Sequence, residues 1–213
     1  MKKLLLATAF LASTAIPALA ATINWDFGQH PGLLGITQTF SAGGETLTAR
    51  GFTGGDVGTR LFSKTGGGDE NGLGLSNDPT GDNEITGRNF VQLNLDGPLA
   101  DHVSNFNFSM GSSTDGEKWA VFGSEDATPF TFVLLASGSD EGVIHSLAAG
   151  FDNYNFFYNG PASGVGGANV LLSSFGGTTS SVPEPSTWAL MGLGFGMMAL
   201  FGVKRRVNRL ASV

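Results

Sequence analysis

The sequence of 213 residues contains no cysteine. Disulfides, thiol nucleophiles and cysteine metal ligands are therefore excluded, and a folded domain must be held by packing and hydrogen bonds. Cations are also scarce, since the segment 21–181 carries five Lys and Arg residues against 17 Asp and Glu residues, a formal charge of −12. Such a surface repels phosphate backbones, and we expect no nucleic-acid partner.

Several catalytic and ligand-binding motifs are missing as well. The histidines His30, His102 and His145 stand alone, without the H-x-H or H-E-x-x-H spacing that collects a transition metal. No G-x-S-x-G occurs, and no glycine-rich run leads into Lys-Ser/Thr, so neither a nucleophile elbow nor a phosphate-binding loop is indicated. Carboxylate pairs such as Asp82 and Glu84 occur, but any acidic chain offers as many. We expect a protein that is not an enzyme, with a secreted glycan-active enzyme as the less favoured alternative.

The N-terminal residues have the pattern of an export signal. Two lysines precede an apolar stretch over residues 4–16, and small residues follow in an A-x-A arrangement. This pattern predicts a signal peptide over residues 1–20, with cleavage between Ala20 and Ala21. The apolar stretch is short for a bilayer, which disfavours a permanent anchor.

Residues 182–206 read VPEPSTWALMGLGFGMMALFGVKRR. Proline on both sides of Glu184 favours an extended, accessible segment there. The uncharged run 188–203 covers about 24 Å as a helix, which is marginal for a membrane span. Cations follow at once, and a cationic flank is held on the cytoplasmic side, so residues 204–213 form a basic cytoplasmic tail and the body lies outside. The cations that directly follow the apolar run are Lys204, Arg205 and Arg206, which we interpret as a basic stop.

This order of proline–glutamate–proline, short apolar helix and basic tail resembles the PEP-CTERM sorting signal of Gram-negative bacteria. The resemblance implies that Pro183, Glu184 and Pro185 are recognised by an exosortase, a membrane-embedded protease that removes the tail. It implies export through the inner membrane, with residence at the cell surface or outside the cell after processing. It also suggests a noncatalytic surface or extracellular-matrix protein that associates with exopolysaccharide or biofilm.

The body of the chain shows the alternation of β-strands. Apolar and polar residues alternate over 23–27, 89–95, 103–110, 129–135 and 153–158, and further strands are expected near 45–52, 117–123, 142–147 and 169–175. Turn residues separate these segments, and no long helical period is found. The pattern predicts an all-β, antiparallel, jelly-roll-like sandwich over residues 21–172, followed by a flexible linker at 173–181 and one short C-terminal apolar helix.

Four large aromatic residues are candidates for stacking on sugar rings if they are exposed, although the alternation favours a place in the core. They are Trp25, Trp119, Tyr154 and Tyr158.

The densest polar stretch lies at residues 66–87, which we interpret as a loop before a strand. Carboxylate oxygens on a turn-rich backbone are the ligands that calcium requires, so Asp69, Asp78, Asp82 and Glu84 are candidate calcium ligands. The spacing does not match an EF-hand, and a solvated acidic loop explains the same composition. A calcium-dependent adhesion or carbohydrate-binding module is therefore kept as an alternative function.

Overall fold

The computed structural model describes residues 20–54, 57–66, 70–77, 81–113, 117–126, 131–160, 169–180, 192 and 194–196. Residues 20–180 form one compact unit, and the terminal segments form a second. The strands of the first unit are β1 (Thr22–Asp26), β2 (Gly32–Leu33), β3 (Thr37–Ala42), β4 (Glu45–Thr53), β5 (Val57–Thr59), β6 (Leu61–Thr65), β7 (Asn71–Leu75), β8 (Phe90–Asn94), β9 (Val103–Gly111), β10 (Trp119–Ser124), β11 (Val133–Gly138), β12 (His145–Ser146), β13 (Asn153–Tyr158) and β14 (Leu171–Thr179). Two short helices, η1 (Phe27–Gln29) and α1 (Asp96–Ala100), follow β1 and β8.

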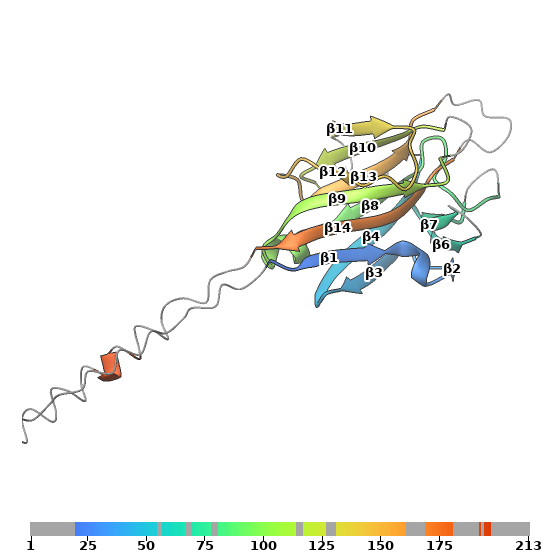
Figure 1. Cartoon of the computed structure of the whole chain (residues 1–213). Coiled ribbons are helices and arrows are strands. Elements are labelled where there is room, and N and C mark those ends of the chain that lie inside the picture. Colours follow the sequence, from blue (N-terminus) through green and yellow to red (C-terminus); the bar gives the residue numbers. More distant parts are fainter. Residues whose placement is uncertain are drawn as a thin grey trace, which may run out of the picture. The chain divides into compact units, whose positions relative to one another are not determined.

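The strands form two antiparallel sheets that pack face to face (Figure 1). Sheet A has the order β12-β9-β14-β7-β6-β2, and β1 pairs with β14 off this path. Sheet B has the order β11-β10-β13-β8-β4-β3, and β5 pairs with β4. The predicted antiparallel β-sandwich is thus confirmed.

The strand order within the two sheets is that of a jelly roll. Sheet A contains the row β1-β14-β9-β12, and sheet B contains the row β8-β13-β10-β11. From β8 to β14 the path crosses between sheets after β8, β9, β11, β12 and β13, and stays within one sheet only from β10 to β11. These eight strands form the two Greek keys of a jelly roll. The remaining strands widen both sheets on one side.

Each of the eight jelly-roll strands overlaps a predicted strand: β1, β8, β9, β11 and β13 overlap segments predicted from alternation, and β10, β12 and β14 overlap the further strands expected near 117–123, 142–147 and 169–175. The structure adds β2, β3, β5, β6 and β7, which the sequence analysis missed. In particular, β7 lies inside the stretch that we interpreted as a loop. Leu73 and Leu75 of β7 are fully buried, and Gly74 lets the chain pass close to its neighbour, because a Cβ there would lie 2.2 Å from the Asn83 carbonyl oxygen.

The linker prediction is wrong over residues 173–179, which belong to β14. β14 pairs with β9, β1 and β7. The Ser, Gly and Thr residues there have the composition of a linker, but Phe175 is fully buried, and a Cβ on Gly177 would lie 2.6 Å from Val103. Small residues at this position allow close packing of the strand.

Aromatic rings fill the space between the sheets. Phe175 of β14 lies 6.1 Å from Trp25, 5.5 Å from Phe106 and 5.9 Å from Tyr154, measured between ring centroids. Pairs of this kind contribute about 0.5–1.5 kcal/mol each beyond the burial of their area. Trp25, Trp119, Tyr154 and Tyr158 are at most 8% exposed, so the interpretation of these residues as core is confirmed.

The outer face of sheet B is also largely buried. Alternation over 89–95 predicts one buried and one solvated side, but Phe90 and Gln92 on the second side are 1% and 3% exposed, so this prediction is wrong for β8. Gln92 donates to Asn155 Oδ1 at 2.9 Å, and Asn155 donates to Ser124 Oγ at 3.1 Å. Beside this row, Phe132 packs on Phe90, Phe122 and Phe157, with centroid distances of 5.4–5.8 Å.

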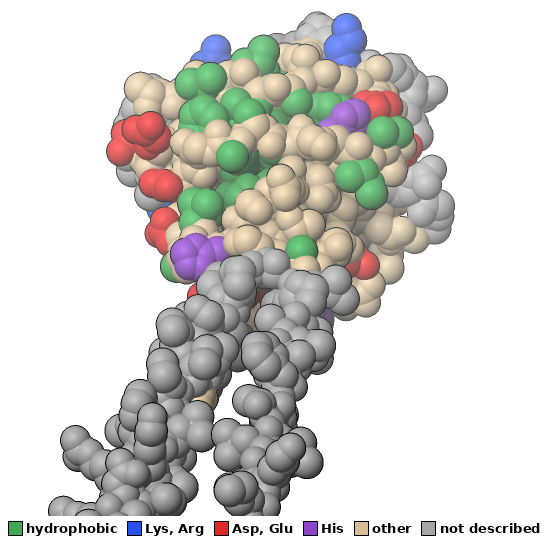
Figure 2. All heavy atoms as spheres, turned by 60° about the vertical axis from the view of Figure 1, so that its left-hand side comes forward, with side chains coloured by type: hydrophobic (Ala, Val, Ile, Leu, Met, Phe, Trp, Pro, Cys, Tyr) green, Lys and Arg blue, Asp and Glu red, His purple; other side chains and the backbone are tan. Residues whose placement is uncertain are grey.

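The solvent-facing surface carries more acid than base. On the face shown in Figure 2, groups of acidic side chains lie toward the margins, and hydrophobic side chains are scattered between polar ones. The most exposed large apolar residues of the sandwich are Ile144 at 71% and Val57 at 60%.

The two ends of the described unit lie side by side. Thr22 pairs with Thr178, and Ala21 N donates to Thr179 Oγ1 at 3.0 Å. Ser180 Oγ donates to the His102 carbonyl oxygen at 3.0 Å. The predicted cleavage site and Ser180, the last residue of this unit, therefore lie at the same end of the sandwich.

Replacing Asn155 with leucine removes the partner of the buried Gln92 amide. We expect the free energy of unfolding to fall by about 1–3 kcal/mol, the cost of a buried unpaired donor. The double variant Gln92→Leu/Asn155→Leu should recover much of this loss, because neither amide is then left alone. Denaturant unfolding of Gln92→Leu, Asn155→Leu and the double variant measures the coupling, and strictly additive losses would contradict the network.

A fragment of residues 20–180 should fold without the terminal segments, because its core is complete within that unit. We expect a β-type far-ultraviolet circular dichroism spectrum and one cooperative thermal transition. A helical spectrum or a gradual transition would contradict this prediction.

Candidate functional site

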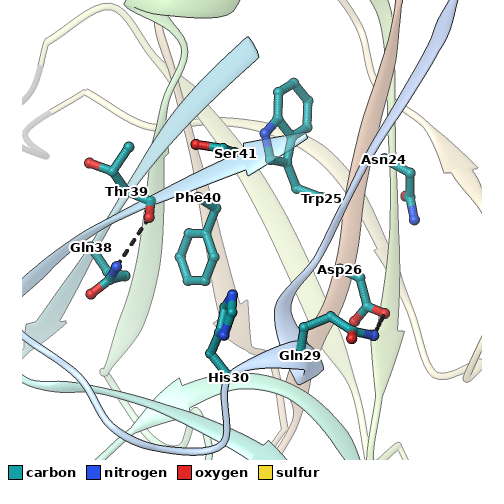
Figure 3. A pocket seen from close by; sticks show the side chains of 9 residues that line it. All are labelled: Asn24, Trp25, Asp26, Gln29, His30, Gln38, Thr39, Phe40 and Ser41. Carbon is teal, nitrogen blue, oxygen red and sulfur yellow. Dashed lines mark hydrogen bonds between the residues drawn. The ribbon is translucent and has the colours of Figure 1, made fainter. Parts of the chain in front are cut away.

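A groove of about 350 Å³ lies at the edge of the sandwich, between β1 of sheet A and β3 of sheet B (Figure 3). In the described part of the chain, β1 pairs only with β14 and β3 only with β4, so one edge of each strand is unpaired. The volume falls in the range of about 300–1,000 Å³ that is typical of ligand pockets. The lining residues are Asn24, Trp25, Asp26, Gln29, His30, Gln38, Thr39, Phe40 and Ser41.

The turn after β1 brings polar side chains to this groove. Asp26 caps the 3-10 helix η1 by accepting from Gly28 N at 3.0 Å, and Gln29 Nε2 donates to the other Asp26 oxygen at 2.6 Å. This capped turn redirects the chain, so that Gln29 and His30 line the groove. On β3 itself, Gln38 Nε2 donates to the Thr39 carbonyl oxygen at 3.1 Å.

Two aromatic residues form the buried base of the groove. Alternation along β1 and β3 turns Trp25 and Phe40 toward the core, where they are 1% and 7% exposed. Phe40 packs edge-on against Phe27 with 4.9 Å between centroids. Their contacts fix the shape of the groove.

The indole nitrogen of Trp25 has no hydrogen-bond partner among the described residues, although it is buried. In Figure 3 the nitrogen lies on the side of the ring nearest Ser41. The comparable indole of Trp119 donates to the Asp140 carbonyl oxygen at 3.0 Å. Nearly all buried donors in proteins are paired, so the Trp25 N–H is an exception that calls for a reason.

Charged groups gather at a second place, around Glu84. Its side chain is 1% exposed and forms an ion pair with Lys64, which also contacts Glu70. The other Glu84 oxygen accepts from Ser112 Oγ at 3.0 Å. Burial raises the pKa of the Glu84 carboxyl above its ordinary 4.5, and the Lys64 charge and the Ser112 hydrogen bond oppose this rise in part.

The candidate calcium ligands are described only in part. Asp69 and Asp78 lie outside the described residues, while Asp82 accepts from Asn169 Nδ2 at 3.3 Å and Glu84 is held in the ion pair with Lys64. Within the described ranges, no group of three or more His, Asp or Glu residues is placed to hold a metal ion. The calcium site stays a prediction.

Of the predicted processing residues, the structure describes only those at the N-terminal cleavage site. Ala20 and Ala21 are exposed at the start of the sandwich, next to β1. Pro183, Glu184, Pro185, Lys204, Arg205 and Arg206 lie outside the described residues.

The predicted membrane helix at 188–203 is described only at residues 192 and 194–196, which are helical. Across the part of the chain that is described, the structure contains no helix long and apolar enough to span a bilayer.

A family model describes the C-terminal segment that the sequence analysis singled out. The model of the PEP-CTERM protein-sorting motif matches residues 181–206. The chain carries a PEP-CTERM sorting motif. The match begins next to Ser180, the last residue of the compact unit. PEP-CTERM signals direct export and sorting to the cell surface or the outside of the cell, with processing by an exosortase.

Comparison with curated proteins and with solved structures gave no significant match.

Sequence reasoning did not find the groove. Its residues come from two segments, 24–30 and 38–41, which meet only because β1 and β3 are the edges of different sheets. Trp25 was considered as a sugar-stacking residue or as core, and the structure makes it core with its nitrogen unpaired. No pattern in the sequence predicts which indole lacks an acceptor.

The raised pKa of Glu84 gives a prediction about pH. Because its pKa is higher in the folded than in the unfolded protein, Glu84 contributes stability that is present below pH 4.5 and is lost as the pH rises through the folded value. Glu84→Gln should remove this loss, so that thermal stability depends less on pH above 4.5 than in the wild type. Thermal unfolding across pH measures it, with the exposed Glu125→Gln as the control. Parallel curves for Glu84→Gln and the wild type would contradict the assignment.

Proposed function

We propose that this chain is a noncatalytic surface or extracellular-matrix protein that is exported through the inner membrane. An exosortase-type protease processes its PEP-CTERM tail, and the released sandwich associates with exopolysaccharide. The observation that carries the proposal is the sorting motif at residues 181–206, immediately after a complete β-sandwich.

The arrangement of the two segments supports processing at the proline–glutamate–proline element. β14 ends at Thr179, and Pro183 follows four residues later in the sequence. Cleavage at this element leaves the whole sandwich intact, because every strand of both sheets lies before it. The product is a folded domain without its apolar run.

The chemistry of the groove supports a binding role over a catalytic one. Glycoside hydrolysis generally uses two carboxyl groups on either side of the bond. Asp26 is the single carboxylate among the lining residues, and both of its oxygens already accept hydrogen bonds. The remaining polar groups are amides, hydroxyls and one imidazole, which suit recognition.

The negative charge of the segment 21–181 suits a neutral polysaccharide better than an acidic one, because like charges repel across a contact surface. Association with exopolysaccharide would thus depend on hydrogen bonds and shape.

Replacing Pro183-Glu184-Pro185 with three alanines tests the sorting function. We expect an unprocessed protein that stays with the membrane fraction, because the recognition element is gone while the apolar run and the basic tail remain. Immunoblots of membrane and extracellular fractions measure the mass and location. The control is Glu125→Ala, an exposed acid of the sandwich, which should be processed as the wild type. An unchanged mature mass and extracellular fraction in the triple variant would overturn the proposal.

A further inference from the structure

The walls of the groove consist mostly of neutral groups that both donate and accept hydrogen bonds. Side-chain amides come from β1, η1 and β3, and hydroxyls come from β3. The single charge, on Asp26, is already bound by Gly28 N and Gln29 Nε2. The polar lining residues other than Asp26 are Asn24, Gln29, His30, Gln38, Thr39 and Ser41.

The base of the groove contains a donor that lacks an acceptor. The Trp25 indole N–H is buried and unpaired among the described residues, whereas the N–H of Trp119 is bound. Leaving a buried donor unpaired is unfavourable, and a ligand oxygen that reached it would remove that penalty. The Trp25 nitrogen is covered in the free protein, so a lining side chain must change rotamer when such an oxygen binds.

The charges of the groove narrow the class of ligand. An anion would meet Asp26 and the formal charge of −12 on the segment 21–181. A metal cation would find one carboxylate with both oxygens occupied. An apolar ligand would cover amides and hydroxyls without pairing them, which is costly. A neutral molecule with many hydroxyl groups avoids all three costs, because it carries no charge and can pair with the amides and hydroxyls of the groove.

We infer that the groove between β1 and β3 binds a neutral glycan, with one of its oxygens accepting a hydrogen bond from Trp25 Nε1. The inference rests on the proposed association with exopolysaccharide and gives that association a site. Gln38 lines the groove from β3 and Asn24 from β1, and His30 lies at the turn after η1.

The indole signals of the protein provide a direct test. The chain has three tryptophans, so the full-length protein labelled with nitrogen-15, in detergent, should show three indole N–H signals that Trp→Phe variants assign. The probes are neutral oligosaccharides of glucose, galactose and mannose, an acidic oligogalacturonate, and an extended Ser/Thr-rich peptide. We expect at least one neutral probe to shift the Trp25 signal downfield and to leave the Trp119 signal in place.

Matched variants measure the contribution of the groove. Trp25→Phe keeps an aromatic ring and removes the donor, and it should weaken binding about fivefold, the effect of one hydrogen bond. Trp119→Phe makes the same change at an indole that already has a partner, and should bind as the wild type. His30→Asn should also weaken binding, with His102→Asn, at the end of the sandwich near Ser180, as its control.

The results separate this inference from the proposed function. Absence of a Trp25 shift with every neutral probe, a shift with the oligogalacturonate or the peptide alone, or unchanged binding by both Trp25→Phe and His30→Asn would overturn the inference. The Trp25 and His30 variants keep Pro183-Glu184-Pro185. Their processing and export therefore test the sorting function separately from glycan binding in the groove. If they still associate with exopolysaccharide at the wild-type level, the groove is not the site and the proposed function stands.

Discussion

The last strand of the sandwich is the element on which both the fold and the groove depend. β14 pairs with β9 along one edge and with β1 and β7 along the other, and its Phe175 contacts aromatic rings from both sheets. In a chain without cysteine, this pairing does what a disulfide does in many exported domains, because it ties the N-terminal strand to the C-terminal one. β1 has no other strand partner in the described residues, so the position of Trp25 and the base of the groove follow from β14.

Several polar side chains inside the sandwich are paired by hydrogen bonds or by an ion pair. The amides of Gln92 and Asn155 form a continuous row with Ser124, and Glu84 is balanced by Lys64 and Ser112. A satisfied network fixes strand register, since a shift by one residue would leave each of these groups alone. The Trp25 nitrogen is one of several buried side-chain atoms without a hydrogen-bond partner in the described residues, and unlike Thr59 Oγ1 and Ser113 Oγ it belongs to a residue that lines the groove. Native proteins tend to break such rules at sites with a function.

The sequence was informative where one physical pattern dominated. Alternation predicted strands that overlap β1, β8, β9, β11 and β13, and in β1 it marks the side that is turned toward the aromatic core. β2 and β5 escaped because they have two and three residues, and β7 escaped because its glycines permit close contact while only two leucines mark its inner side. β3 and β6 contain only one and two large apolar residues. The final strand was taken in part for a linker for the same reason. The sorting motif, in contrast, depends on local order in the sequence and could be found without any structure. The groove could not, since it exists only when the edges of two sheets meet.

The pairing of the first strand with the last also governs how the sandwich is made. Ala21 and Thr179 are separated by 158 positions, so their hydrogen bond closes nearly the whole domain into one loop. Contacts of such long sequence separation form late, because the entropy of closing the loop is lost before any pairing compensates for it. Until residue 179 is available, β1 has no strand to join and Trp25 and Phe106 lack the ring of Phe175. β1 therefore joins its sheet only once the segment immediately before the sorting motif is available.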